Sequence, residues 1–277
     1  MSAGEKVIAA TVPPGSASRP RPAGLPPFVA TLLTFGAILL LWLCASSFGW
    51  ASPVFLPHPA KVLAAVGRLV TQGYVDGTLW QHASVSLGRV FSALGFSILV
   101  AVPAGLAIAT SPVGRGVLDP LIEFIRPLPP LAYLPLIIIW FGIGEPSKVL
   151  VIALAMIAPI AISTASGVRS ASQNQVNAAR SFGASRLDVL LHVQLPSALP
   201  SILTGIRIAL GAGWSTLVAA ELVAASRGLG FMIQSAAQFL VTDIVIVGIF
   251  VISALAFAFE ALLRLVEKLF VRWSGHH

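Results

Sequence analysis

Charged residues are scarce in this chain. Asp, Glu, Lys and Arg together make up 10% of its 277 residues, whereas hydrophobic residues make up 57%. A water-soluble domain of this length needs far more charge to cover its surface. The composition therefore argues against a soluble enzyme or binding module and favours a protein whose solvent is the lipid bilayer.

Cysteine and clustered histidine are nearly absent as well. Cys44 is the one cysteine and lies in an apolar run, which argues against a disulfide framework or a metal cluster. The five histidines show no H-x-x-x-H spacing, and the chain holds no G-x-S-x-G nucleophile turn and no G-x-x-x-x-G-K-[ST] phosphate loop. We therefore expect no catalytic residue, no metal and no cofactor in this chain.

The net charge of +7 is distributed in a way that argues against nucleic acid. The 17 basic residues stand singly between apolar stretches and form no patch interleaved with aromatic side chains. Basic residues at the ends of apolar spans are what orientation in a membrane requires. The expected partner is the bilayer, and no nucleic acid.

Six apolar runs are candidates for membrane spans. About 20 apolar residues cross the hydrocarbon core as a helix, and prolines inside such helices are tolerated when neighbours satisfy the freed carbonyls. The third run holds four prolines, which suggest a broken helix rather than a straight one. We predict an all-α polytopic membrane bundle of about six transmembrane helices, at Val29–Phe48, Val90–Thr110, Pro127–Gly144, Val149–Val168, Ile202–Ala225 and Ile244–Leu263.

The distribution of basic residues predicts the orientation. With the N-terminus inside, ten basic residues fall in inside segments and four in outside segments, so both termini are expected inside. Residues 1–28, rich in Pro, Gly, Ser and Ala, are predicted to be a flexible cytoplasmic tail. Residues 29–268 form the transmembrane domain and 269–277 a second cytoplasmic tail. The outside connection after the first run contains an amphipathic segment, Lys61–Val70.

Residues 173–196, in the inside connection between the fourth and fifth runs, are predicted to form two short helices around a turn. Gly183-Ala184 supplies the turn, because glycine adopts a left-handed conformation cheaply. Ser185 with Asp188 three residues later is the pattern of a capping box. Pro196 lacks a backbone N–H, so we expect it to prevent simple continuation of the second helix.

This segment resembles the cytoplasmic EAA loop of bacterial ABC importer permeases. The family pattern is Glu-Ala-Ala, three residues, Gly, nine residues, Ile, one residue and Leu-Pro. The chain matches it at Ala178-Ala179, Gly183 and Leu195-Pro196, whereas Asn177 stands where the family often has Glu and Val193 where it often has Ile. The residues that the resemblance assigns to ATPase coupling are Asn177, Ala178, Ala179, Gly183, Ala184, Ser185, Asp188, Leu195 and Pro196.

Three further stretches narrow the resemblance. Leu79–His82, Arg126–Glu145 and Gly213–Met232 are similar to permeases for sulfonates, nitrate and related small anions, with the taurine branch nearest. The expected cargo is taurine or a related alkanesulfonate, and nitrate or a thiamine precursor is the alternative within the same class. An ion-coupled secondary transporter is a rival of another class, which would show internal repeats and an intramembrane carboxylate site.

The resemblance also implies partners and a location. It implies a homodimer of permease subunits in the bacterial inner membrane, with two ATP-binding subunits docked on the EAA loops from the cytoplasm. ATP and Mg would be bound by those subunits, and a periplasmic substrate-binding protein would deliver the cargo. Hydrolysis would then come entirely from a partner.

Glu221 is the ionisable residue that stands out within the fifth run. A charge in the membrane interior normally faces a partner or a water-filled cavity. Glu221 could therefore line the path, act in gating, or pair with Arg207 or Arg227. Arg207 lies about 21 Å before Glu221 along a helix, which is too far for the two side chains to pair within one helix. We favour a structural or gating role over substrate contact.

Trp214, Ser215 and Thr216 lie near the middle of the same run and are candidate path-lining residues. The two hydroxyl groups are equally suited to hydrogen-bond with carbonyl groups one helical turn earlier. Glu123 and Arg126, three residues apart, are expected to form a local ion pair at the start of the third run.

Overall fold

Helices make up every extended element of the part of the chain that the computed structural model describes, residues 26–270. Only an isolated bridge, Tyr74 to Gly77, has β-type pairing there. The predicted all-α fold is therefore confirmed. The two predicted tails, 1–28 and 269–277, lie outside the described residues except for 26–28 and 269–270. The helices are α1 Pro27–Ser47, α2 Pro59–Thr71, α3 Leu79–Thr110, α4 Pro112–Ile125, α5 Pro130–Phe141, α6 Glu145–Arg169, α7 Gln173–Ser181, α8 Arg186–Val189, the π-helical η1 Leu190–Gln194, α9 Leu195–Ala224, α10 Leu229–Gln238 and α11 Thr242–Phe270.

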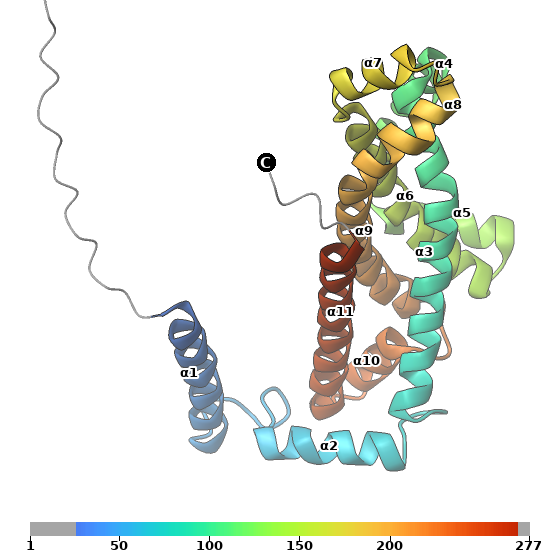
Figure 1. Cartoon of the computed structure of the whole chain (residues 1–277). Coiled ribbons are helices and arrows are strands. Elements are labelled where there is room, and N and C mark those ends of the chain that lie inside the picture. The colour runs from blue at the N-terminus through green and yellow to red at the C-terminus, as the bar shows by residue number, and fades with distance from the viewer. Residues whose placement is uncertain (1–25, 271–277) are drawn as a thin grey trace, which may run out of the picture.

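Five of these helices are long and apolar enough to cross a membrane, and they contain the first, second, fourth, fifth and sixth predicted runs. Most of them extend beyond the apolar run, because a helix continues into the interface with polar residues that hydropathy does not count. The predicted amphipathic segment is confirmed as α2, which lies across the end of the bundle (Figure 1). Its buried residues are Val62, Ala65 and Leu69, which share one face at helical spacing.

The third predicted run, Pro127–Gly144, is not one helix. The chain divides here into α4 and α5, which are bent by 105° at the break. Pro127, Pro129 and Pro130 have no backbone N–H, and each disfavours the helical conformation of the residue before it. With 12 residues α5 is too short to span by itself. The placement of a whole span at 127–144 was therefore wrong, and α4 supplies the other part of this crossing.

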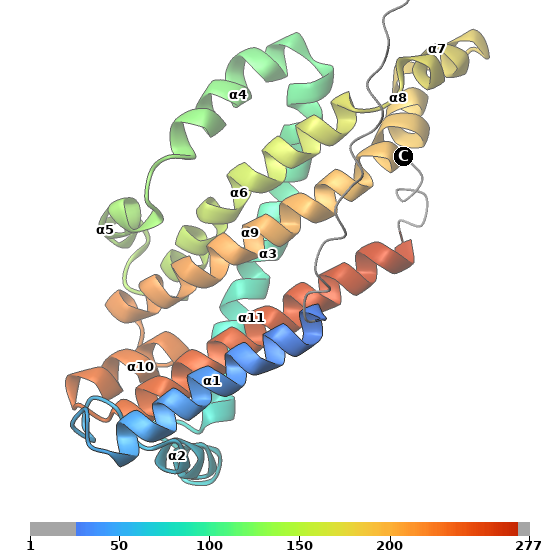
Figure 2. The same ribbon diagram turned by 90° about the vertical axis from the view of Figure 1, so that its left-hand side faces the viewer.

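The direction of the neighbouring helices shows that α4 and α5 together return the chain across the bundle. The Ser97 hydroxyl donates to the Ala153 carbonyl, and Gly105 approaches Ala161 closely, so residues of α3 face residues of α6 at a constant sequence offset. A constant offset means that α3 and α6 run parallel. The intervening chain must cross back, as Figure 2 shows for α4. Six crossings follow, and both ends of the described chain lie on one side.

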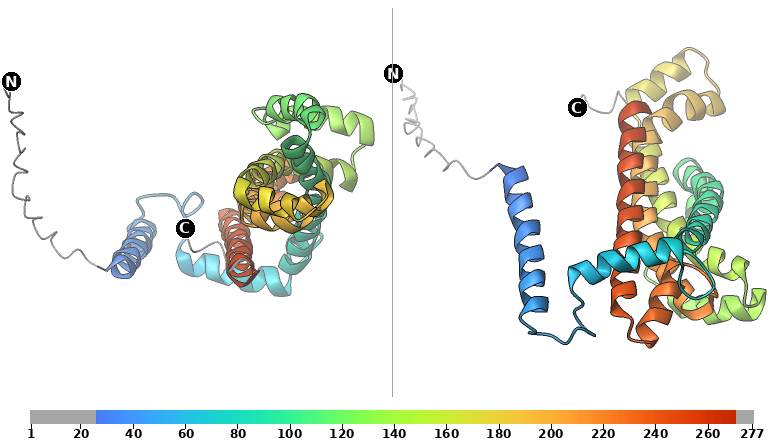
Figure 3. Two further views of the ribbon diagram at one scale, coloured as in Figure 1. Left: turned by 45° about the horizontal axis from the view of Figure 1, so that its top comes forward. Right: turned by 90° about the horizontal axis from the view of Figure 1, so that it is seen from below.

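Helix α6 lies at the centre of the bundle and packs against α3 and α9 (Figure 2). A side chain at Gly105 would collide with Ala161 and Thr164 of α6, and one at Gly205 would collide with Ser163. Such small residues let helix backbones approach closely in a membrane. In contrast, α1 stands at the edge of the molecule, and its most apolar window is 0% buried (Figure 3). Its apolar surface faces the bilayer or another subunit.

The prediction about Pro196 was wrong. The helix does not stop there: α8, η1 and α9 follow one another without a break from Arg186 to Ala224. Residues Leu190–Gln194 form a π-helical turn directly before the proline. Hydrogen bonds in a π-turn reach five residues back and widen the backbone, so the missing N–H and the ring of Pro196 fit without ending the helix.

Candidate functional site: the coupling hairpin and the central cavity

The hairpin of α7 and α8 projects from one end of the bundle (Figure 1). Gly183 has φ +84, the left-handed conformation that its sequence position predicted. The Ala184 N–H donates to the Ala179 carbonyl at 3.1 Å, and the Gly183 N–H donates to the Arg180 carbonyl at 2.9 Å. This pair of bonds is a Schellman motif, which satisfies carbonyl groups at the end of α7. The predicted turn is confirmed.

A capping box begins α8, also as predicted. The Asp188 N–H donates to the Ser185 hydroxyl at 3.2 Å, and the Ser185 N–H donates to the Asp188 carboxylate at 3.0 Å. The box thus satisfies two backbone N–H groups at the start of α8, those of Ser185 and Asp188. Leu195 and Pro196 lie at the first two positions of α9, so they are placed beyond the hairpin at the base of the span.

The outer surface of the hairpin combines small and apolar residues. Asn177 and Ala178 are exposed, and Ala179 is half-buried. Phe182, at the end of α7, is 93% exposed, which sequence reasoning did not single out. An aromatic side chain directly before a turn glycine was the available signal. Asn177 is held by α7 itself, since it accepts from the Gln173 amide at 3.0 Å.

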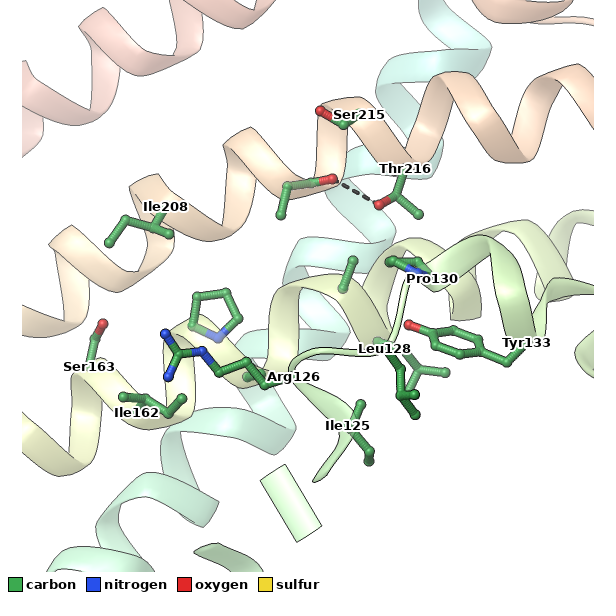
Figure 4. Close-up of a pocket in the computed structure, with 15 residues that line it drawn as sticks. Ile125, Arg126, Leu128, Pro130, Tyr133, Ile162, Ser163, Ile208, Ser215 and Thr216 are labelled. Atoms are coloured by element: carbon green, nitrogen blue, oxygen red, sulfur yellow. Dashed lines mark hydrogen bonds between the residues drawn. The ribbon is translucent and has the colours of Figure 1, made fainter. Parts of the chain in front are cut away.

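A cavity of about 520 Å³ lies between the α4–α5 break, α6 and α9 (Figure 4). Its walls are largely apolar and come from the middle of α6 and of α9. The polar side chains that line it are Arg126, Tyr133, Ser163, Ser215 and Thr216, and no carboxylate does so. Sequence reasoning placed Arg126 in a local ion pair with Glu123. No such pair occurs in the part of the chain that the structure describes.

Of the candidate path residues, only the two hydroxyl residues lie at this cavity. The Thr216 hydroxyl donates to the Ala212 carbonyl at 2.9 Å, and the Ser215 hydroxyl donates to the Gly211 carbonyl at 3.3 Å, one turn earlier in each case. Trp214 is buried on another side of α9, where its ring stacks on Phe259 of α11 at 6.3 Å. The structure therefore separates Trp214 from its two neighbours.

Glu221 lies away from the cavity, in a buried ion pair near the opposite end of the bundle from the hairpin. Its side chain is 0% exposed, and its carboxylate accepts from the Arg89 guanidinium at 2.6 Å. It also accepts from the Ser86 hydroxyl at 2.8 Å and the Gly230 N–H at 2.7 Å. Arg207 instead pairs with Glu267 at 3.5 Å. The pairing with Arg207 or Arg227 that sequence reasoning considered is therefore wrong, and the partner is Arg89 of α3.

Arg89 connects four segments at this point. Its guanidinium, 3% exposed, also donates to both carboxylate oxygens of Glu145 at the start of α6, at 2.6 and 2.7 Å. A further bond at 2.8 Å reaches the Arg227 carbonyl in the α9–α10 connection. Lys148 pairs with Glu145 at 2.9 Å. The polar groups of this charge network satisfy one another, as burial away from water requires.

The comparisons with known proteins agree with this geometry. The family described as binding-protein-dependent transport system inner membrane component matches residues 98–272. The taurine transport system permease protein TauC of Escherichia coli (strain K12) is 53% identical over 243 residues, which are 87% of this chain and 88% of that protein. The putative aliphatic sulfonates transport permease protein SsuC of the same organism is 40% identical, over 86% of this chain and 89% of that protein.

Solved structures confirm the fold. An inward-facing MetNI methionine ABC transporter chain matches with a TM-score of 0.54 and 19% identity, over 65% of this chain and 92% of that one. A chain of an amino acid ABC transporter matches with a TM-score of 0.55 and 18% identity, over 76% and 96%. The six crossings, the hairpin between the fourth and fifth and the extent of the sequence match lead to one conclusion. This chain belongs to the binding-protein-dependent transport system inner membrane components, and it is a multi-pass ABC permease of the bacterial inner membrane.

Proposed function

We propose that this chain is the membrane-spanning subunit of an ATP-driven importer for taurine or a related small alkanesulfonate. The observation that carries the proposal is the 53% identity with a taurine permease along nearly the whole length of both chains. The cavity agrees in charge, because its one ionic side chain is the cation Arg126 and a sulfonate is an anion. Residues 29–268 form the permease domain, and residues 1–28 and 269–277 are its cytoplasmic tails.

The hairpin of residues 173–196 is the docking site for an ATP-binding subunit. Its exposed tip presents Ala178 and Phe182, a small and a large apolar residue side by side on the end of α7. ATP and Mg bind to that partner, whose closure displaces the hairpin. Because α8 continues through η1 into α9, a displacement of the hairpin is passed directly to the helix that lines the cavity. Coupling thus needs one rigid element with two positions.

Two copies of the permease, two ATP-binding subunits and a periplasmic substrate-binding protein complete the importer. Helix α5, which contributes Pro130 and Tyr133 to the cavity lining, carries exposed apolar side chains farther along, among them Ile139 at 76% and Trp140 at 67%. Such an apolar surface can pack against a second permease copy within the bilayer. The homodimer encloses the path between its two cavities.

Reconstitution tests this proposal. The chain is purified with its ATP-binding subunits, and uptake of labelled taurine into proteoliposomes is measured with and without ATP and the binding protein. We expect uptake that requires the ATP-binding subunits, ATP and the binding protein. A stable complex that moves nitrate or a thiamine precursor but no alkanesulfonate would refute the cargo, and uptake that persists with an inactivated ATPase would refute the importer in favour of an ion-coupled carrier.

Gly183→Pro tests the hairpin separately. Proline requires φ near −65°, whereas this position has φ +84, so the turn must change shape. We expect inserted protein whose uptake is uncoupled from ATP hydrolysis. Gly49→Pro is the matched control, since Gly49 has φ +70 at the other end of the bundle and no neighbouring atom within 4 Å. Normal ATP-driven uptake by Gly183→Pro would count against the docking role.

A further inference from the structure

Arg126 is an arginine that lies beside the middle of helix α6. It ends α4 and faces the stretch of α6 between Leu154 and Ser163, which is well inside the 25 residues of that helix. Its guanidinium makes no hydrogen bond or ion pair with the described residues. A cation at this depth is costly unless a counter-charge or a water-filled cavity meets it. The position is therefore suited to an anion that enters the cavity.

The surroundings of Arg126 exclude the ordinary counter-charge. No Asp or Glu lines the cavity, and Glu123 three residues earlier does not pair with Arg126. Figure 4 shows the guanidinium extending along α6 toward Ser163, with the α9 hydroxyl residues across the cavity. The N-terminal end of α5, at Pro130, also borders the cavity and adds partial positive charge of the same sign.

The hydroxyl groups supply the second half of a site for a zwitterion. Ser215 and Thr216 use their hydroxyl hydrogens on helix carbonyls, so what they offer to the cavity is oxygen lone pairs. Tyr133 adds a third hydroxyl from α5. Neutral acceptors such as these can receive bonds from an ammonium group without competing with the sulfonate for Arg126, as a carboxylate would.

We infer that Arg126 is the residue that recognises the sulfonate group of the cargo within the membrane, with Ser215, Thr216 and Tyr133 facing the remainder of the molecule. This inference rests on the proposed function and assigns its cargo-binding residue in the permease. The planar guanidinium fits two sulfonate oxygens at once, which an ammonium group does not. Selectivity in the path is then for a small organic anion, and an added ammonium group is accepted but not required.

The experiment compares Arg126→Gln, Arg126→Lys and Arg115→Gln in proteoliposomes that contain the ATP-binding subunits, with saturating taurine-loaded binding protein. Arg115 is the matched control, because its side chain also has no partner among the described residues but borders a different pocket, at the α3–α4 turn. Two quantities are measured on each sample: taurine taken up and ATP hydrolysed. The ratio separates recognition of the cargo from assembly and docking.

We expect Arg126→Gln to lower taurine uptake per ATP about tenfold, which is the loss of about 1.4 kcal/mol. ATP hydrolysis should stay at the wild-type level, and Arg126→Lys should recover part of the uptake because it keeps the charge. Ethanesulfonate should be carried by the wild-type path, and Arg126→Gln should impair it equally. A wild-type ratio in Arg126→Gln, or an equal loss in Arg115→Gln, would overturn the inference.

The outcomes also separate this inference from the proposed function. Wild-type protein that carries no alkanesulfonate would refute the proposed cargo, whatever the variants do. Wild-type protein that carries taurine while Arg126→Gln and Arg126→Lys match it would refute only the role of Arg126. Loss of both uptake and ATP hydrolysis in Arg126→Gln, with both kept in Arg126→Lys, would assign Arg126 to assembly and likewise overturn the role proposed for it.

Discussion

Arg89 and Arg126 both lie beside α6, but Arg89 is buried and Arg126 is exposed. Arg89 is buried and bonded to Glu221, to Glu145 and to a backbone carbonyl, so it joins α3, α6, α9 and the α9–α10 connection. Arg126 lies beside a cavity, and its guanidinium makes no hydrogen bond or ion pair with a described residue. An arginine with four of its five donors bonded to protein stabilises the fold, whereas one whose side-chain donors are free has capacity for a ligand. Arginine thus has a structural role near one end of the bundle, at Arg89, and the role proposed for Arg126 near the middle is to bind a ligand.

Glu221→Ala should show the largest effect. It removes the acceptor for Arg89, Ser86 and the Gly230 N–H at once, and a buried charge left without its partner costs about 3–5 kcal/mol. We expect a strongly lowered melting temperature of the purified protein in nanodiscs. The double variant Arg89→Met/Glu221→Leu should recover much of the loss, because it removes both charges. A single variant as stable as wild type would show that the network is not structural.

Gly228→Ala should destabilise the same network by about 1–3 kcal/mol through backbone strain. Gly228 has φ +133, and an added Cβ would lie 2.5 Å from the Glu221 carboxyl group. Gly49→Ala is a control with φ +70 and open space around it, so it should cost less. Thermal unfolding of the two variants side by side measures the difference. Equal melting temperatures would contradict the close packing around Glu221.

Glu145→Gln should cost only about 1 kcal/mol or less, because its side chain is 57% exposed and exposed ion pairs are screened by water. The loss should shrink as salt concentration rises, since salt weakens exposed pairs more than buried ones. Unfolding measured across a salt series checks this. A salt-independent loss as large as that of Glu221→Ala would mean that both carboxylates act as buried partners.

Arg126→Gln should change stability least, by no more than about 0.5 kcal/mol, because its guanidinium makes no hydrogen bond or ion pair with the described residues. Melting temperature in nanodiscs is again the measurement. An unchanged melting temperature together with the expected loss of uptake would show that Arg126 affects transport and not stability, in contrast to Arg89. A loss of stability comparable to that of Gly228→Ala would remove the contrast between the two residues.

The turn of the hairpin and the start of α8 could be predicted, because their signals are local. Gly183 and the Ser185–Asp188 pair act on residues within one helical turn, and that range is short enough for sequence to specify. The partner of Glu221 could not be predicted in this way. Arg89 is far from Glu221 in sequence, whereas Arg207 and Arg227 are near it, and only the packing of α3 against α9 selects between them.

Prolines illustrate the limit of sequence: the break at 127–130 was expected, whereas its bounds and the passage of a helix through Pro196 were not. Pro196 was expected to prevent simple continuation of a helix and the prolines at 127–130 to sit within a single broken span. In fact the first is accommodated by a π-turn, while the second group separates α4 from α5 at 105°. A proline removes one hydrogen bond in either case, but the neighbours decide whether the backbone widens or bends. Residue type alone does not carry that information.

The unbroken helix from Arg186 to Val223 gives the molecule a mechanical property. Its 38 residues, at 1.5 Å each, make a rod of about 57 Å. A rod of that length turning about its midpoint by ten degrees moves each end by about 5 Å, in opposite directions. Residues near the midpoint barely move. A partner that pushes on one end can therefore open space at the far end while Ile208, beside the cavity, serves as part of the fulcrum.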